Sequence, residues 1–138
     1  MNEVSVQWIE GNAFATTTGS GHTLVLDSKP KEGSISAGPS PMEMLLVGVA
    51  GCTAIDVVHI LERQRQPMTG LTVNVSGERA SDYPMVYTHI TIEYVVRGDV
   101  DEQKLKRAID LSEEKYCSAS IMLGKMAKIE HSYRLEKE

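Results

Sequence analysis

Residues 38–61, with the sequence GPSPMEMLLVGVAGCTAIDVVHIL, decide the fold of this chain. Ser40, Pro41 and Glu43 carry the signals with which a helix begins. A serine cap accepts a hydrogen bond from the first free N–H groups, and proline loses nothing at the first helical position. A glutamate three residues after the cap completes a capping box. The stretch therefore predicts a helix that begins at Pro41.

The body of this helix, Met44 to Leu61, is apolar on nearly every face. This pattern is typical of a helix surrounded by protein, although a run of this length also suggests a membrane span. Asp56 and His59 in the middle, together with the small residues Gly48 and Gly51, argue against a span. We therefore predict a buried core helix and no membrane association.

One thiol, Cys52, lies on this helix beside Gly51 and other small residues. Small neighbours permit either tight packing around an inert buried cysteine or the close approach of a substrate to its sulfur. At about 3.6 residues per turn, Asp56, His59 and Arg63 fall on the same helical face as Cys52. A structural network at a subunit contact and a catalytic site explain this polar stripe equally well.

Length and charge narrow the classes of function. The 138 residues predict a single domain, residues 1–138, and the net charge of -5 offers no basic surface for nucleic acid. The first residues lack the basic start and apolar run of a signal peptide, so a cytoplasmic location is expected. In the cytoplasm two cysteines are expected to be reduced thiols and not a structural disulfide.

Alternating apolar residues predict strands on both sides of the central helix. Asp99 is the expected cap of a second, amphipathic helix, and a short third helix is expected to end at Gly124. The order β-β-β-α-β-β-α-α-β predicts an α+β fold in which antiparallel sheets wrap around the buried central helix. One copy of these strands is too small to cover that helix, so two chains are expected to share their helices. In chain order, the predicted strands lie within residues 4–8, 13–18, 22–27, 71–76, 90–96 and 129–135.

The second cysteine, Cys117, lies at a helix junction and suggests a dithiol cycle with Cys52, provided that the fold brings the two together. In such a cycle Cys52 attacks a peroxide as a thiolate, and the sulfenic acid condenses with Cys117. The thiolate requires a lowered pKa. Cys52 lies about 18 Å from the helix cap at ~1.5 Å per residue. Because the effect of the helix dipole fades within the first turn, it does not lower the pKa of Cys52. Unless the helix breaks at Gly48 or Gly51, a cation is expected nearby.

Three motifs, residues 38–45 (GPSPMEML), 50–53 (AGCT) and 114–117 (EKYC), form a recognisable set. Together with the order of the elements they resemble the OsmC/Ohr family, the osmotically inducible protein C and organic hydroperoxide resistance proteins, and in particular its YhfA-like branch. The resemblance covers essentially the whole chain. It implies an OsmC-like fold and an intertwined homodimer with two active sites at the subunit interface.

The same resemblance implies an activity in oxidative-stress defence. The protein is expected to be a thiol-dependent peroxidase that reduces organic hydroperoxides, with Cys52 at the peroxidatic position and Cys117 at the resolving position. An external dithiol, of the lipoyl or small-thiol kind, is expected as the reductant. No metal and no bound organic cofactor are expected.

The chain departs from the family pattern in its activating groups. Family peroxidases place an arginine of the N-terminal half beside the reactive thiol, whereas the first arginine here is Arg63. The family's partner glutamate would fall at Met42, and this chain has Glu43 instead. Because one residue corresponds to about 100° of helix rotation, helix capping is the preferred interpretation of Glu43, and an orienting carboxylate is the alternative that makes it a candidate site residue. The candidates for the missing cation are Lys29, Lys31, Arg63, Arg79 and a residue of the second chain.

Two other functions stay open. A non-peroxidatic dimer of the same fold would bind a small apolar ligand in a pocket lined by methionines. A zinc site would combine Cys52 and Cys117 with His59 or His131, because two thiolates and two imidazoles suit zinc. The candidate pocket methionines are Met42, Met44, Met122 and Met126.

Overall fold

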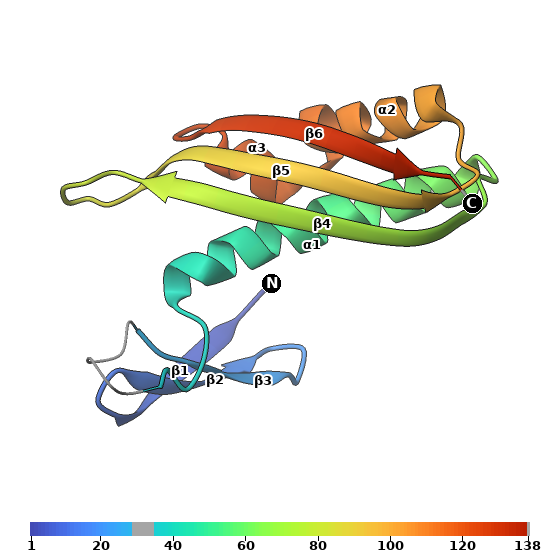
Figure 1. The fold of residues 1–138 in the computed structure, drawn as a ribbon. Helices are drawn as coiled ribbons and strands as arrows, with labels where there is room; N and C mark the ends of the chain where they lie inside the picture. The colour runs from blue at the N-terminus through green and yellow to red at the C-terminus, as the bar shows by residue number, and fades with distance from the viewer. Residues whose placement is uncertain (29–34, 138) are drawn as a thin grey trace. The chain divides into compact units, whose positions relative to one another are not determined.

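The computed structural model describes residues 1–28 and 35–137, and it confirms the predicted α+β class and order of elements (Figure 1). A short π-helical turn, η1, is added between the second and third α-helices. The chain divides into two compact units, Met1–Leu45 and Leu46–Glu138. The elements are β1 (Val4–Glu10), β2 (Ala13–Thr18), β3 (Thr23–Leu26), α1 (Pro41–Arg63), β4 (Met68–Arg79), β5 (Tyr87–Gly98), α2 (Glu102–Leu111), η1 (Ser112–Tyr116), α3 (Ser118–Leu123) and β6 (Lys128–Glu136).

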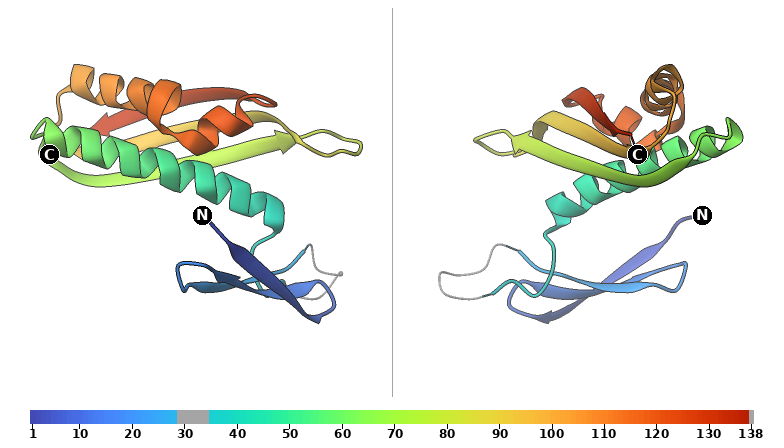
Figure 2. Two further views of the ribbon diagram at one scale, coloured as in Figure 1. Left: turned by 180° about the vertical axis from the view of Figure 1, so that it is seen from behind. Right: turned by 45° about the vertical axis from the view of Figure 1, so that its right-hand side comes forward.

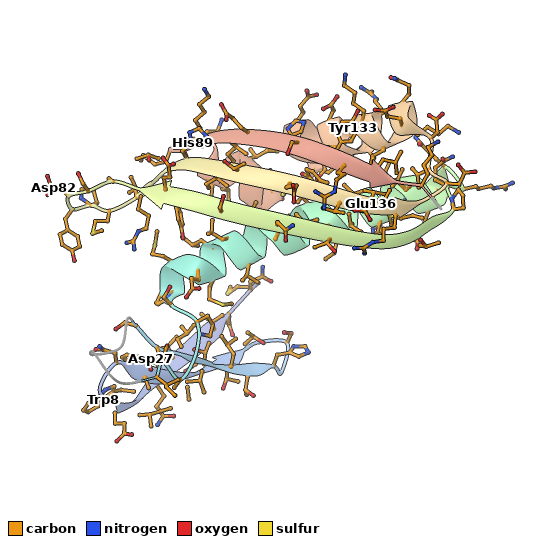
Figure 3. The ribbon with its side chains drawn as sticks, viewed as in Figure 1. Trp8, Asp27, Asp82, His89, Tyr133 and Glu136 are labelled. Atoms are coloured by element: carbon orange, nitrogen blue, oxygen red, sulfur yellow. The ribbon has the colours of Figure 1, made fainter. Side chains whose placement is uncertain are left out.

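The first unit contains an antiparallel sheet in the order β1-β2-β3. The β1–β2 turn includes Gly11, whose φ of 55 lies in the left-handed region that glycine adopts at low cost. The indole N–H of Trp8, which is labelled in Figure 3, donates to the Gly11 carbonyl over 3.0 Å. Val4 and Trp8 are 69% and 65% exposed, so β1 buries little of its apolar surface within the chain.

The second unit contains a sheet in the order β4-β5-β6. β4 and β5 form an antiparallel pair, as predicted, but β6 runs parallel to β5. The expectation of purely antiparallel sheets was therefore wrong for this pair. A parallel neighbour requires a long crossover, and here α2, η1 and α3 form that connection.

The two faces of the second sheet differ in polarity. Helices α2 and α3, and α1 from Leu46 onward, lie on one face (Figures 1 and 2). The other face carries ion pairs such as Arg97 with Glu136 over 3.3 Å, and Figure 3 labels Glu136. The helix-covered face builds a core that is fully buried at Ile90, Ile92, Tyr94, Val96, Leu105, Ala108, Val49, Val57 and Leu61.

Helix α1 begins as the sequence predicts. The Ser40 Oγ accepts from the Glu43 N–H over 3.2 Å, and the Glu43 carboxylate accepts from the Ser40 N–H over 2.9 Å. This reciprocal pair is a capping box. In α2 the cap is Asp101 and not Asp99, because the Asp101 carboxylate accepts from the Lys104 N–H over 3.0 Å.

Within the single chain α1 is buried along one face and not on all sides. Its apolar window has a mean hydropathy of 2.1, so by length and composition alone it could cross a membrane, yet only 22% of that window is buried. Core helices of soluble proteins have the same composition, and the buried residues of α1 pack in the core described above. These buried residues are Val49, Thr53, Val57 and Leu61.

Candidate functional site

The structure brings the two predicted cysteines together. Cys52 lies half-buried on α1, whereas Cys117 is fully buried between η1 and α3. Their sulfur atoms and a carboxylate oxygen of Asp56 all lie within 4.8 Å of one another. Asp56 was predicted to share a helical face with Cys52, and it forms the polar wall of this thiol pair.

The π-helical turn η1 determines the position of Cys117. The Cys117 N–H donates to the Ser112 carbonyl over 2.6 Å, which closes the wide turn, and Cys117 then caps α3. The Ser120 N–H donates to the Cys117 sulfur over 3.4 Å. Single π-turns within helical segments occur frequently at functional sites. Here the turn places the Ser112 side chain and the Cys117 thiol on the same side, against α1.

Burial raises the pKa of the Cys117 thiol, because it disfavours the thiolate. Hydrogen bonds from Ser120 lower this pKa, while the neighbouring Cys52 raises it further. The net direction is upward from the ordinary value. A thiol that stays protonated suits the resolving position better than the attacking position.

A chain of buried hydroxyls leads away from the thiol pair. The Ser112 hydroxyl donates to the Asp56 carboxylate over 2.9 Å and lies 2.7 Å from the Thr53 hydroxyl. The Thr53 hydroxyl lies 2.8 Å from the Tyr94 hydroxyl. Thr53, Ser112 and Tyr94 are each fully buried, so the two contacts between their hydroxyls are closed to solvent, whereas the Ser112–Asp56 contact is part-buried.

The hydrogen-bonded series of hydroxyls ends near the surface of the second unit. The Tyr94 hydroxyl donates to the Glu113 carboxylate over 2.8 Å, and the other Glu113 oxygen pairs with the His131 Nδ1 over 3.0 Å. The Glu113 side chain is 13% exposed and that of His131 is 34% exposed, and Asp110 lies 3.8 Å from the other ring nitrogen. Burial raises the pKa of Tyr94 far above its ordinary value, so this hydroxyl stays neutral at physiological pH.

The hydrogen bonds of Tyr94 and Ser112 were not predicted from the sequence. Thr53 was also not predicted as a functional residue. The available signal was a threonine directly beside Cys52 on an apolar helix, three positions before Asp56.

Glu43 is held elsewhere. Its carboxylate bonds to Ser40, and these hydrogen bonds lower its pKa below the ordinary value of 4.5. Successive helical residues turn by about 100°, so nine positions place Glu43 and Cys52 on opposite sides of the helix axis. Within this chain Glu43 acts as a cap, and its role as an orienting carboxylate stays a prediction.

The candidate cations have different surroundings. Lys29 and Lys31 lie outside the described residues. The Arg79 guanidinium donates to the Met85 carbonyl over 2.8 Å, at the end of β4. Arg63 lines a groove of about 370 Å³ that has Asp56 in its wall. The groove is lined by Asp56, His59, Ile60, Arg63, Gln64, Leu111 and Tyr116.

Two of the methionines proposed for a ligand pocket lie on the surface, since Met122 is 73% exposed and Met126 is 67% exposed.

The predicted zinc ligands are only partly assembled. Cys52, Asp56 and Cys117 are chemically suitable and close together, but across residues 1–28 and 35–137 neither His59 nor His131 belongs to the cluster. The contacts that are present, from Ser112 to Asp56 and from Ser120 to Cys117, describe a hydrogen-bonded thiol pair.

Comparisons with known proteins agree with the family resemblance. Residues 31–132 match the family described as OsmC-like protein. The chain is 41% identical to Protein YhfA of Escherichia coli (strain K12) over 134 residues, which cover 96% of this chain and 97% of that protein.

Solved structures extend the similarity to the fold. A hypothetical protein from Aquifex aeolicus VF5 is 32% identical, with a TM-score of 0.89 over 100% of this chain and 98% of that chain. An organic hydroperoxide resistance protein OsmC from Legionella pneumophila is 15% identical, with a TM-score of 0.73 over 96% of each chain. At that identity the second likeness concerns the fold alone.

Proposed function

Because the chain belongs to the OsmC-like family, we propose that it is a thiol-dependent peroxidase that reduces organic hydroperoxides in oxidative-stress defence. Cys52 is the peroxidatic thiol and Cys117 the resolving thiol. We place the protein in the cytoplasm, where cysteines are kept reduced. The proposal needs no bound metal or organic cofactor, and elemental analysis of the purified protein tests that expectation.

The proposed cycle balances with a dithiol as the external reductant. The Cys52 thiolate attacks the distal oxygen of the hydroperoxide, the O–O bond breaks, and the alkoxide leaves as the alcohol after it takes a proton. The Cys52 sulfenic acid then condenses with the Cys117 thiol, which forms the disulfide and releases water. The dithiol reduces the disulfide by exchange and is itself oxidised.

The observation that supports this cycle best is the proximity of two thiols that lie far apart in the sequence. Their sulfurs are within 4.8 Å, whereas a disulfide requires about 2.05 Å, so a small local movement closes the bond. Cys52 is the more exposed of the two, which suits the thiol that meets the substrate. The groove beside Asp56 offers a route for a small molecule.

A homodimer forms part of the proposal. The face of α1 opposite the core is apolar and exposed, with Val47 at 57% and Ile55 at 58%. A Cβ atom added at Gly48 or Gly51 would meet nothing within 4 Å in the described residues of the chain. Small residues between apolar ones allow a second helix to approach closely. We therefore assign this face to contact with a second copy of the chain.

The test is oxidation by one equivalent of cumene hydroperoxide, followed by intact mass and a count of free thiols. We expect both thiols of the native protein to be lost in a Cys52–Cys117 disulfide, faster than with hydrogen peroxide. Cys117→Ser is the matched control, because it should stop at the Cys52 sulfenic acid. Cys52→Ser should abolish consumption of the peroxide.

Two free thiols after long exposure would contradict the peroxidase. That result would favour the second function, binding of a small apolar ligand in the 370 Å³ groove, where Ile60, Leu111 and Tyr116 supply the apolar wall.

A further inference from the structure

The hydroxyl chain between Asp56 and Glu113 contains more contacts than its hydroxyl protons can satisfy. Each hydroxyl owns one proton, so Ser112, Thr53 and Tyr94 provide three. The four contacts Asp56–Ser112, Ser112–Thr53, Thr53–Tyr94 and Tyr94–Glu113 need one proton each. If both end carboxylates are ionised, three protons serve four contacts, so in one contact two oxygens face each other with no hydrogen between them. Because Ser112 and Tyr94 donate to the two carboxylates, the missing proton falls at Thr53, between fully buried hydroxyls, where such a pair is costly.

We propose that this hydroxyl relay (Asp56, Ser112, Thr53, Tyr94 and Glu113) holds one additional proton, shared between its two end carboxyls, and moves it between the thiol pair and the surface. When the proton is on Asp56, every hydroxyl donates toward Glu113. When it is on Glu113, every hydroxyl donates toward Asp56. The two arrangements interconvert when each hydroxyl receives one proton and passes one on.

The ends of the relay are placed for exchange with two different surroundings. Asp56 lies within 4.8 Å of both sulfurs, so its carboxyl can exchange a proton with Cys52 or Cys117. Glu113 bonds to His131, which is 34% exposed and also faces Asp110, so the outer end exchanges with solvent through an imidazole. The buried Tyr94 keeps its proton, as its raised pKa also indicates.

The role of the relay in the reaction rests on the proposed peroxidase function. The Cys52 proton passes to Asp56, and Glu113 releases one to solvent through His131. The resulting thiolate lies beside a neutral Asp56, so the repulsion between two negative charges is avoided. Asp56 then protonates the leaving alkoxide, and in the second step it passes the Cys117 proton to the departing hydroxide, which leaves as water. The relay regains its extra proton from solvent, so the cycle balances.

The decisive variant is Thr53→Val, which removes the central hydroxyl and keeps the side-chain shape. Ser112 then donates to Asp56 and Tyr94 to Glu113, so two protons satisfy two contacts and no extra proton is needed. Infrared spectroscopy of the reduced protein at neutral pH detects the C=O stretch of a protonated carboxyl. We expect this band in the native protein and its loss in Thr53→Val.

The chain offers a matched control in Thr16, a buried threonine whose hydroxyl has no hydrogen-bond partner within the described residues. Thr16→Val should retain the band, and so should Thr53→Ser, which keeps the hydroxyl at position 53. Absence of the band in the native protein, or its persistence in Thr53→Val, would overturn the proposal. This arm uses no peroxide, so its outcome is independent of the peroxidase assignment.

A second measurement links the relay to the thiol. General acid–base groups typically contribute about 100-fold or more, so alkylation of Cys52 by iodoacetamide at neutral pH should slow by about 100-fold in Thr53→Val. Thr53→Ser and Thr16→Val should react at the native rate. An unchanged rate in Thr53→Val would overturn the role of the relay in thiolate formation, even if the infrared band is lost.

Discussion

The two faces of helix α1 are both uncharged over most of their length, yet one face is buried within the chain and the other is exposed. The inner stripe, Val49, Thr53, Val57 and Leu61, is buried in the core of the second unit. The outer stripe, Gly48, Gly51, Ile55 and His59, is exposed. Composition therefore does not determine burial here; the presence of a packing surface in the same chain does.

The comparison also separates two kinds of function. Cys52 and Asp56 lie beside the inner stripe, and Thr53 is at the centre of the buried hydrogen bonds, so the proposed chemistry belongs to a packed environment. The outer stripe carries no hydrogen-bonding network within the described residues. Its glycines and Ile55 suit close approach of another apolar surface.

The largest effect is expected from Leu61→Ala on the inner stripe. Leu61 is fully buried, and truncation of a buried leucine costs about 3 kcal/mol in lost burial and cavity formation. Ile55→Ala on the outer stripe is the control, because Ile55 is 58% exposed and its truncation should change the unfolding free energy of an isolated chain by less than about 0.5 kcal/mol. Urea denaturation at several protein concentrations measures both. Equal losses in the two variants at low concentration would contradict the assignment of the faces.

Some of the features that distinguish buried from exposed surfaces could be predicted from the sequence. The capping box at Ser40 and Glu43 was recognised because it depends on local spacing alone, and the strand β5 was predicted from the simple alternation between Ile90 and Val96. Burial of α1 on only one face was not predictable, since an apolar sequence does not say whether its cover comes from the same chain.

The other features that the sequence did not predict also depend on contacts between residues far apart in the chain. The parallel β5–β6 pair was missed because the alternation in a strand does not name its partner. The hydroxyl relay was missed because Ser112 reaches Asp56 through a π-turn, whereas helical periodicity assumes an α-helix throughout. The proximity of Cys52 and Cys117 came from the family resemblance, and not from their spacing.

A smaller effect is expected on association when the outer stripe is changed. In Gly51→Leu the added Cβ meets nothing within 4 Å in the described residues and Gly51 is exposed, so the chain should fold as before. Close helix contact in a homodimer would be blocked, and the dimer dissociation constant should rise at least about tenfold, which equals about 1.4 kcal/mol. Gly51→Ala should give an intermediate value. Sedimentation analysis that finds equal association in all three proteins would exclude this face as the dimer contact.

The smallest effect is expected for Glu43, which lies at the start of helix α1. Its substitution distinguishes a helix cap from a catalytic carboxylate. Its folded pKa is lowered by the bonds to Ser40, so it contributes stability that is present above the unfolded pKa and is lost as pH falls through the folded value. Glu43→Gln preserves the capping box, because glutamine also accepts from the cap N–H, but it should remove this acid-side pH dependence. Denaturation midpoints measured below and above the ordinary pKa of 4.5 report the difference. As a cap, Glu43 should leave the rate of Cys52 oxidation unchanged in this variant, whereas a slower oxidation with unchanged stability would identify Glu43 as an orienting carboxylate.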